Sequence, residues 1–273
     1  MLKPPYPELD ALLVMIGQVG KRLSEIEASE GAAGNISLCI RWPINVFNYF
    51  PVEEEFELPQ SVPELAGATF LISGSGCRLR EIIDEPSVHL ACMIVNEAGK
   101  TAKLYSSPQR RFEHITSEFN SHLAVHYAQM CASDTNFHAI LHAQPVYLTY
   151  LSHIVRYLNE QYLNAHLLRW QPETIINLPE GLGCIPFRVP GSAELMADNV
   201  KLLRTHHLVI WAKHGVMARS GVSLNHALDL VEYAEAAARY EYLNLSIGEI
   251  SDGLSADEIR EICRAFNVQQ SIF

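Results

Sequence analysis

Two histidines, His142 and His214, stand where a metal site can be built. Each follows a short apolar run that is typical of a buried strand, and a residue that turns the chain comes soon after: Pro145 in one case and Gly215 in the other. Strand ends that face a loop often carry sites, and glycine permits close approach of a ligand. The two imidazoles are therefore candidates for one shared metal ion. The alternative is an ordinary interior or surface histidine in each case. Position alone favours it, since the chain holds 12 histidines.

Glu118 is the third candidate, in the stretch Thr116-Ser-Glu118 at the start of a predicted helix. A carboxylate in the first turn of a helix interacts favourably with the helix dipole, and from position alone this is the stronger explanation. The functional alternative is a general base beside a metal ion, or a metal ligand. Two histidines and one glutamate form a known catalytic zinc set, with a fourth position left open for water or substrate.

Gly74-Ser-Gly76 is a small turn whose backbone amides could hold an anion, with Asn35 as an added side-chain donor. A plain tight turn is the simpler explanation for these residues alone. The sequence lacks the motifs of serine nucleophiles and of nucleotide binding. The chain has no Gly-x-Ser-x-Gly elbow between a strand and a helix, and neither a phosphate P-loop nor a dinucleotide-binding fingerprint.

The elements that must position these residues follow from the hydrophobic periodicity. Helical spacing predicts a helix over 8–28, and a strand is expected over 35–42. Short apolar stretches separated by turn residues predict four more strands, near 46–58, 68–73, 88–96 and 101–105. The first part of the chain is therefore expected to form a meander of strands.

Helices and strands alternate in the second part of the chain. Helices are predicted over 116–132 with Thr116 as cap, from Pro145 to about 158, over 160–169, 192–204 and 224–245, and after Ser255, which begins a capping-box pattern. Strands are predicted over 137–142, 174–178, 184–189, 207–212 and 215–218. This pattern favours a sheet covered by helices, in one α/β domain over residues 1–273.

The composition limits which classes of partner the protein is expected to bind. A net charge of −11 disfavours nucleic acid and anionic membranes as partners, although a small anionic substrate responds only to local groups. No run of about 18 apolar residues is present, so no membrane span is expected. The first residues lack the apolar core of a secretory signal. The six scattered cysteines include no CxxC pair and are expected to be buried free thiols, which favours the cytoplasm.

Taken in order, several motifs resemble those of the class II aldolase/adducin family. The matching stretches are Gly34-Asn-Ile-Ser-Leu38, Ile72-Ser-Gly-Ser-Gly76, Thr116-Ser-Glu118 with His122, Ile140-Leu-His142, Pro172-Glu173, Leu178-Pro-Glu-Gly-Leu-Gly183, Val189-Pro-Gly-Ser192, Trp211-Ala-Lys-His-Gly-Val216 and Asp229-Leu-Val-Glu-Tyr-Ala-Glu235. They span nearly the whole chain. No single piece is decisive, but so many in the correct order are hard to obtain by chance.

The resemblance implies a three-layer α/β/α sandwich around a mainly antiparallel sheet, and a homotetramer with sites between subunits. It implies metal-dependent retro-aldol cleavage of a small phosphorylated ketose, with Zn²⁺ or another divalent cation as cofactor. His142 and His214 fall on zinc-ligand positions, and Glu118 falls on the acid/base position. Glu173 falls on a second catalytic carboxylate near the sugar hydroxyls. The positions that hold the substrate phosphate are those of Asn35, Ser75, Gly76 and Ser117.

The sequence departs from the family pattern at two places. The usual His-x-His metal motif is His142-Ala-Gln144 here, so Gln144 or a water is expected to complete the metal shell, although glutamine is a poorer zinc ligand than imidazole. Ala32 stands where the phosphate turn usually has an asparagine. Two alternatives therefore stay open: another enzyme on the same scaffold (a different ketose-phosphate aldolase, a phosphosugar 4-epimerase or a dehydratase), or an adducin-like binding protein without catalysis.

Overall fold

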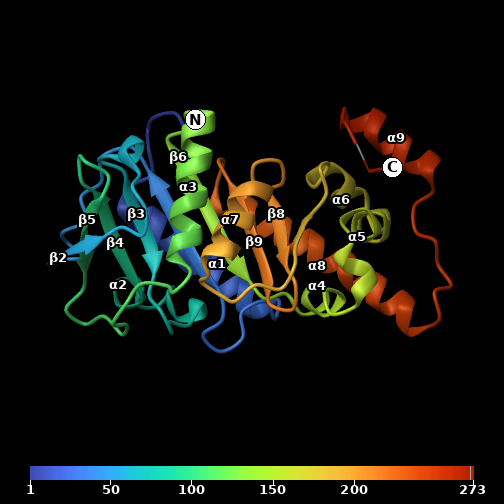
Figure 1. Ribbon diagram of the computed structural model, residues 1–273, viewed down its shortest axis with the longest axis horizontal. Helices are drawn as coiled ribbons and strands as arrows, with labels where there is room; N and C mark the ends of the chain where they lie inside the picture. The colour runs from blue at the N-terminus through green and yellow to red at the C-terminus, as the bar shows by residue number, and fades with distance from the viewer. Residues whose placement is uncertain (271) are drawn as a thin grey trace.

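A nine-stranded sheet forms the centre of the protein, as the computed structural model in Figure 1 shows. The structure describes residues 1–270 and 272–273. The strand order across the sheet is β2-β5-β4-β3-β1-β6-β9-β8-β7. The strands are β1 (Asn35–Ile40), β2 (Val52–Glu57), β3 (Thr69–Ser73), β4 (Leu90–Val95), β5 (Thr101–Ser106), β6 (Phe137–Ala143), β7 (Gly183–Ile185), β8 (Leu208–Trp211) and β9 (Gly215–Ser220).

Neighbouring strands run antiparallel, apart from the pair β7 and β8, which is parallel. The meander predicted for the first part of the chain is seen in β3, β4 and β5, which are adjacent in this order. The central strand β1 lies between β3 and β6. In its register with β6, Asn35 lies opposite His142, so the start of one strand meets the end of the other.

Helices cover both faces of the sheet. They are α1 (Leu9–Glu25), α2 (Pro86–His89), α3 (Phe119–Ser133), α4 (Val146–Leu151), α5 (Glu160–Leu167), α6 (Pro172–Asn177), α7 (Ala193–Leu202), α8 (Leu224–Ser246) and α9 (Ala256–Phe266). Short 3-10 helices span Pro63–Leu65, Leu79–Glu81, Val155–Leu158 and Leu168–Trp170. In Figure 1, α3 and α7 lie in front of the sheet, and α4, α5, α6 and α9 gather at the right-hand end.

The alternation of side chains along each strand divides the core between the two faces. One face packs against α1 and α8, and the central strands contribute Ile36, Leu38 and Leu141 to it. The opposite face lies under α3 and α7, where Ile140 and Met217 pack against Val125 of α3. The three layers follow from this alternation, as an antiparallel sheet with both faces buried requires.

Two local predictions are wrong. Residues 174–178 do not form a strand, because α6 covers Pro172–Asn177. Pro172 suits the first helical turn, where its missing N–H costs nothing, and this outweighs the β-branched residues that suggested a strand. Thr116 is not the cap of α3 either. The N-cap position belongs to Glu118, and the Thr116 hydroxyl accepts the Glu118 N–H two residues further on.

The other predicted elements are present, with boundaries shifted by a few residues. The helix expected from Pro145 to about 158 is divided into α4 and the 3-10 helix Val155–Leu158. The capping box at Ser255 is formed. All six cysteines are free. Cys39, Cys77 and Cys92 are buried, whereas Cys184 and Cys263 are half-buried and Cys131 is exposed, contrary to the expectation of burial. Within the described residues, no helix combines the length and the apolar character that crossing a membrane would need.

Candidate metal centre

The candidate metal centre is built on the face of the sheet that α3 covers. Because Ile36, Leu38 and Leu141 point to the opposite face, the alternation along β1 and β6 turns Asn35 and His142 toward α3. The register pairs these two residues directly. Their side chains therefore meet under the start of α3, where Glu118 lies.

Glu118 is buried, with 4% of its surface exposed, and its side chain forms no capping hydrogen bond with α3. Its Oε2 instead accepts a hydrogen bond of 2.8 Å from the Asn35 side-chain amide. The same oxygen lies 3.7 Å from Nε2 of His142, and Oε1 lies 3.8 Å from Nε2 of His214. The side chain thus faces the two histidines, which a favourable helix dipole alone does not explain.

His142 is oriented by the backbone of β9. Its Nδ1 lies 2.8 Å from the carbonyl oxygen of Val216, so Nδ1 carries the proton and donates it there. Nε2 is left with a lone pair toward Glu118. The ring also stacks on Trp211, with centroids 4.5 Å apart. An imidazole held in this way through its second nitrogen is the arrangement usual for a metal ligand.

His214 reaches the same point from the tight turn between β8 and β9. Lys213, just before it, has a positive φ of 65°, and its N–H is fixed by a hydrogen bond to the Ser152 hydroxyl. Burial holds the pKa of His214 below its ordinary value, with His142 acting in the same direction and Glu118 opposing. The neutral imidazole, which is the form that binds metal ions, is therefore favoured.

Glu118, His142 and His214 together offer three donor atoms that all lie within 4.8 Å of one another. Two donors bound to one tetrahedral zinc ion at about 2.1 Å lie about 3.4 Å apart. The two Nε2–oxygen distances are only a few tenths of an ångström longer than this. The donor set fits a divalent cation, with two imidazoles, one carboxylate and room for further ligands.

Gln144 follows His142 at the end of β6 and is half-buried. Both side chains pack over Gly215: a Cβ placed on Gly215 would lie 3.1 Å from Cγ of Gln144 and 3.2 Å from Cε1 of His142. Gln144 therefore lies beside His142, on the side where the resemblance places a third ligand. Whether its amide oxygen contacts a metal ion stays a prediction.

Gly215→Ala is expected to disturb the centre through its backbone. The added Cβ would collide with the carbonyl oxygen of Ala143, which cannot move aside as a flexible side chain would, and would press on His142. We expect a loss of about 1–3 kcal/mol in the free energy of unfolding, the usual cost of overpacking, together with weaker metal binding. Urea unfolding and a cobalt titration measure the two effects. Gly221→Ala, where the nearest atom would be 3.9 Å away, is the matched control.

A row of buried polar groups continues from Asn35 along α3. The Asn35 Oδ1 lies 2.5 Å from Nε2 of His122, whose Nδ1 lies 2.6 Å from the Ser37 hydroxyl. The same hydroxyl lies 2.7 Å from Nε2 of His126, and the Nδ1 atoms of His126 and His138 are 2.8 Å apart. The spacing explains the row: Glu118, His122 and His126 are four residues apart on one helix face, and Ser37 and His138 alternate with the apolar residues of β1 and β6.

Burial lowers the pKa of His122 and of His138 to about 3, and that of His126 well below its ordinary value. An unfolded histidine titrates near 6.5, so the unfolded chain takes up protons that the folded chain refuses. Stability is then present above about pH 6.5 and is lost as the pH falls below it.

In metal-free protein the three histidines are expected to contribute a loss of about 4 kcal/mol in unfolding free energy per pH unit between about pH 5.5 and 4.5, at about 1.4 kcal/mol each. Glu235, whose pKa burial raises to about 7, acts in the opposite direction. Urea unfolding across this range measures the slope, and His138→Gln should lower it by about 1.4 kcal/mol per pH unit, the effect of one proton fewer. Equal slopes in the wild type and in His138→Gln would show that this imidazole is not buried in the neutral form.

Ser75, Gly76 and Ser117, the predicted phosphate-binding residues, lie on adjacent segments and are all exposed. A bridge between Gly74 and Ile115 holds the two segments together. The Ser75 N–H already donates to the carbonyl oxygen of His114, so the hydroxyls of Ser75 and Ser117 are the freer donors. Asn35 differs from these residues, because its amide is engaged with Glu118 and His122.

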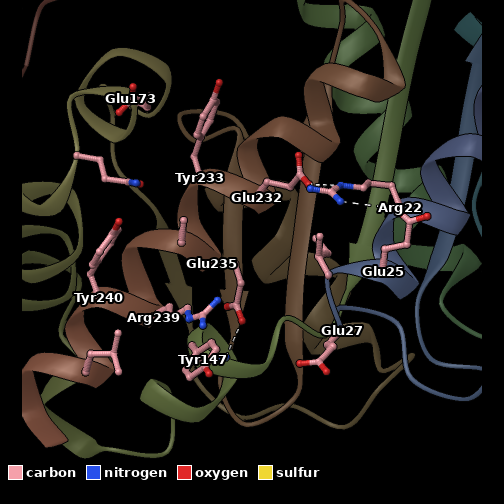
Figure 2. A pocket seen from close by; sticks show the side chains of 14 residues that line it. Arg22, Glu25, Glu27, Tyr147, Glu173, Glu232, Tyr233, Glu235, Arg239 and Tyr240 are labelled. Carbon is pink, nitrogen blue, oxygen red and sulfur yellow. Dashed lines mark hydrogen bonds and ion pairs between the residues drawn. The ribbon is translucent and has the colours of Figure 1, made fainter.

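Glu173 is not brought together with the metal cluster. It lies in the first turn of α6 and lines a different cavity of about 860 Å³, shown in Figure 2. Glu118, His142 and His214 are not among the residues that line it. In Figure 2 the cavity lies along α8, with the pair Arg22–Glu232 on one side and Glu173 on the other.

The sequence model of the class II aldolase and adducin N-terminal domain matches residues 15–242. The chain belongs to this family. The aldolase and adducin match covers the whole of the candidate metal centre. It also covers the sheet from β1 to β9, so the fold and the centre lie within the part that the family shares.

Among curated relatives, a rhamnulose-1-phosphate aldolase of Yersinia pestis (strain Pestoides F) is 28% identical over 224 residues, 81% of this chain and 80% of that protein. A sugar-phosphate aldolase of Thermotoga maritima superposes with a TM-score of 0.71 and 28% identity, covering 88% of this chain and 97% of that one. An L-fuculose-1-phosphate aldolase of Thermus thermophilus (TM-score 0.56, 18% identity, 88% and 97% covered) shares the fold. The predicted α/β sandwich with a mainly antiparallel sheet is confirmed.

Sequence reasoning placed Glu118, His142 and His214 as candidates but missed the groups that orient them. The Val216 carbonyl carries no signal in sequence, because a backbone acceptor has no residue type. Trp211 stands in a quoted motif, but its contact with His142 depends on how β8 and β6 are placed in the sheet. The buried row of His122, His126 and His138 did leave a signal. Two histidines at four-residue spacing after Glu118 share one helix face, and that spacing could have found two members of the row.

Proposed function

We propose that this protein is a metal-dependent aldolase that cleaves L-rhamnulose 1-phosphate to dihydroxyacetone phosphate and L-lactaldehyde. The observation that carries the proposal is the cluster of Glu118, His142 and His214, in which one buried carboxylate faces two imidazoles, and His142 is held through its second nitrogen as metal ligands usually are. The protein's membership in the class II aldolase and adducin family supports the proposed class of reaction. The similarity to a rhamnulose-1-phosphate aldolase supports the choice of sugar.

The residue types suit the chemistry of carbon–carbon cleavage. Breaking the bond between C3 and C4 of the ketose turns the C4 hydroxyl, after loss of its proton, into the aldehyde, and leaves the electron pair as a carbanion on C3 next to the ketone. The charge on C3 must be stabilised until a proton is added there. Zn²⁺ or another divalent cation, held by His142, His214 and a third group, supplies this stabilisation as a Lewis acid. Glu118 is within reach of the same point and transfers a proton to or from the reacting carbon. Its hydrogen bond from Asn35 keeps the carboxylate in place.

The substrate phosphate is proposed to bind at Ser75, Gly76 and Ser117, which are exposed on adjacent segments. Asn35 belongs to the same predicted set. We propose that its side-chain amide also contacts the substrate phosphate from its position between Glu118 and His122. Two serine hydroxyls can donate to phosphate oxygens, and Gly76, at a positive φ of 73°, leaves its amide unshielded by a side chain.

Glu173 is proposed to act on the sugar hydroxyls from a neighbouring subunit of a homotetramer. It is exposed and lies apart from the metal cluster of its own chain, so a second chain is needed to bring such a carboxylate to the site. The six free cysteines fit a reducing compartment, and we propose the cytoplasm as the place of action.

The decisive experiment is a retro-aldol assay on L-rhamnulose 1-phosphate with Zn²⁺, Co²⁺ or Mn²⁺ added, read out through dihydroxyacetone phosphate. L-fuculose 1-phosphate and ribulose phosphates are assayed in parallel. Metal-dependent cleavage with preference for the rhamnulose ester supports the proposal. Preference for another ester, or epimerisation at C4 without cleavage, would assign the protein to another enzyme on this scaffold.

A binding protein without catalysis is the second candidate, because Gln144 stands beside His142 where the family usually has a third imidazole. Metal analysis of protein purified without chelator separates the two. Bound metal at about one ion per chain favours the enzyme. Absence of both bound metal and metal-stimulated cleavage favours the binding protein.

A further inference from the structure

The hydrogen bonds in the row of polar groups that ends on Glu118 all donate in the same direction, toward Glu118. The Asn35 Nδ2 donates to Oε2 of Glu118 at 2.8 Å, which leaves the Asn35 Oδ1 turned toward His122. An amide oxygen only accepts hydrogen bonds, so Nε2 of His122 must donate to it. The first two links of the row therefore fix the proton of His122 on Nε2.

The same reasoning fixes the protons further along the row. His122 is a neutral imidazole with its proton on Nε2, so its Nδ1 accepts from the Ser37 hydroxyl at 2.6 Å. The Ser37 oxygen then accepts from Nε2 of His126 at 2.7 Å. Nδ1 of His126 accepts from Nδ1 of His138 at 2.8 Å. Each proton in the row therefore points toward Glu118.

The far end of the row agrees with this assignment. If Nδ1 of His138 donates, its Nε2 carries only a lone pair. That atom is buried and has no hydrogen-bond partner among the described residues. Burial keeps all three imidazoles neutral by lowering the pKa of each, so each has one proton and one acceptor nitrogen. If every hydrogen bond in the row ran the other way, the Asn35 Oδ1 would have to donate to Nε2 of His122. An amide oxygen has no proton to donate.

We propose that Ser37, His122, His126 and His138 form a positioning network that holds the Asn35 amide with its NH₂ group toward Glu118. The network does not carry protons to the site, because Asn35 cannot pass a proton from one end of its amide to the other. It sets the orientation of Asn35, and through Asn35 the orientation of the Glu118 carboxylate. The effect on catalysis rests on the function proposed above, whereas the arrangement of protons does not.

Ser37→Ala removes one of the two contacts that fix the proton of His122. Nδ1 of His122 then loses its donor, and the Asn35 oxygen is left to hold the proton on Nε2. The Asn35 amide is held less firmly, and so is the hydrogen bond that it donates to the Glu118 carboxylate.

The direct test is the tautomer of each histidine in the metal-free wild-type protein, measured by ¹⁵N NMR of histidine-labelled material. We expect the proton on Nε2 of His122 and of His126, and on Nδ1 of His138, all unchanged between pH 6 and 8. The opposite tautomer at His122, or a positively charged imidazole in the row, would overturn the proposal. This measurement needs no variant and no activity.

Ser37→Ala tests the consequence, with Ser121→Ala as the matched control. Ser121 is also fully buried and is hydrogen-bonded to Asn199, outside the network. We expect Ser37→Ala to raise the population of the Nδ1 tautomer at His122, to weaken Co²⁺ binding, and to lower kcat by about tenfold at most, the effect of losing one neutral hydrogen bond. KM should change less than kcat, because Ser75, Gly76 and Ser117 are untouched and only the Asn35 amide is held less firmly.

The control should keep the wild-type tautomers, Co²⁺ affinity and kcat. Equal effects of the two variants on all three would overturn the positioning role, since loss of packing alone would then explain them. If the wild-type protein cleaves no sugar phosphate, the proposed function fails. In that case the tautomers and the Co²⁺ titrations alone decide the proposal.

Discussion

Glu118→Gln is expected to lower retro-aldol turnover by about 10²–10⁴-fold, the range that general acid–base catalysis contributes. Glutamine has nearly the same shape, and its amide oxygen can still accept the hydrogen bond from Asn35. It cannot take up or release the proton at the reacting carbon. The effect should therefore fall on kcat, with the folded structure retained, and steady-state kinetics with far-ultraviolet circular dichroism measure both.

The matched control for this variant is Glu113→Gln, which changes an exposed carboxylate five residues earlier in the chain. It should leave kcat and KM unchanged. Turnover near the wild-type value in Glu118→Gln would remove Glu118 from the proton transfer. A low activity that is restored by excess metal would instead assign Glu118 to metal binding alone.

His142→Ala is expected to abolish stoichiometric metal binding, and with it turnover. The substitution removes one of three clustered donors and leaves Glu118 facing His214 alone. Losing a residue that only hydrogen-bonds to a metal ligand already lowers metal affinity by about 10- to 100-fold. Losing a ligand itself lowers metal affinity far more. Isothermal titration with Zn²⁺ or Co²⁺, and metal content after dialysis, measure the loss.

His153→Ala serves as the control, because His153 is exposed and outside the cluster. It should bind metal as the wild type does. Full metal occupancy in His142→Ala, at unchanged affinity, would place the ion elsewhere in the protein. His214→Ala should behave as His142→Ala does, since the two imidazoles face the same carboxylate.

The fold was predictable from sequence to a large extent, because its periodic signals are strong. The helical spacing of apolar residues in α1 and the apolar runs of β6 and β8 depend only on which side chains are apolar. The error at residues 174–178 has a local cause: two adjacent isoleucines suggested a strand, whereas Pro172 starts a helix there. Preference for β structure depends on context more than helix capping does.

The candidate site was predictable in its residue types but not in its connections. Glu118, His142 and His214 could be named because histidine and glutamate are the usual metal ligands. The role of Asn35 toward Glu118 could not, because it depends on the register that sets Asn35 opposite His142. A shift of that register by one residue would turn Asn35 to the other face of the sheet.

The register of β1 and β6 also has a consequence for how the protein reaches its native state. The metal donors at positions 118, 142 and 214, and Asn35 beside them, come from segments far apart in the sequence. Strand β1 pairs with β6, about a hundred residues further along the chain. Such non-local pairing forms late and slowly during folding. The three donors come together only when these segments have packed in the folded sheet. Ion binding then favours the native state through mass action and reports on the completion of folding.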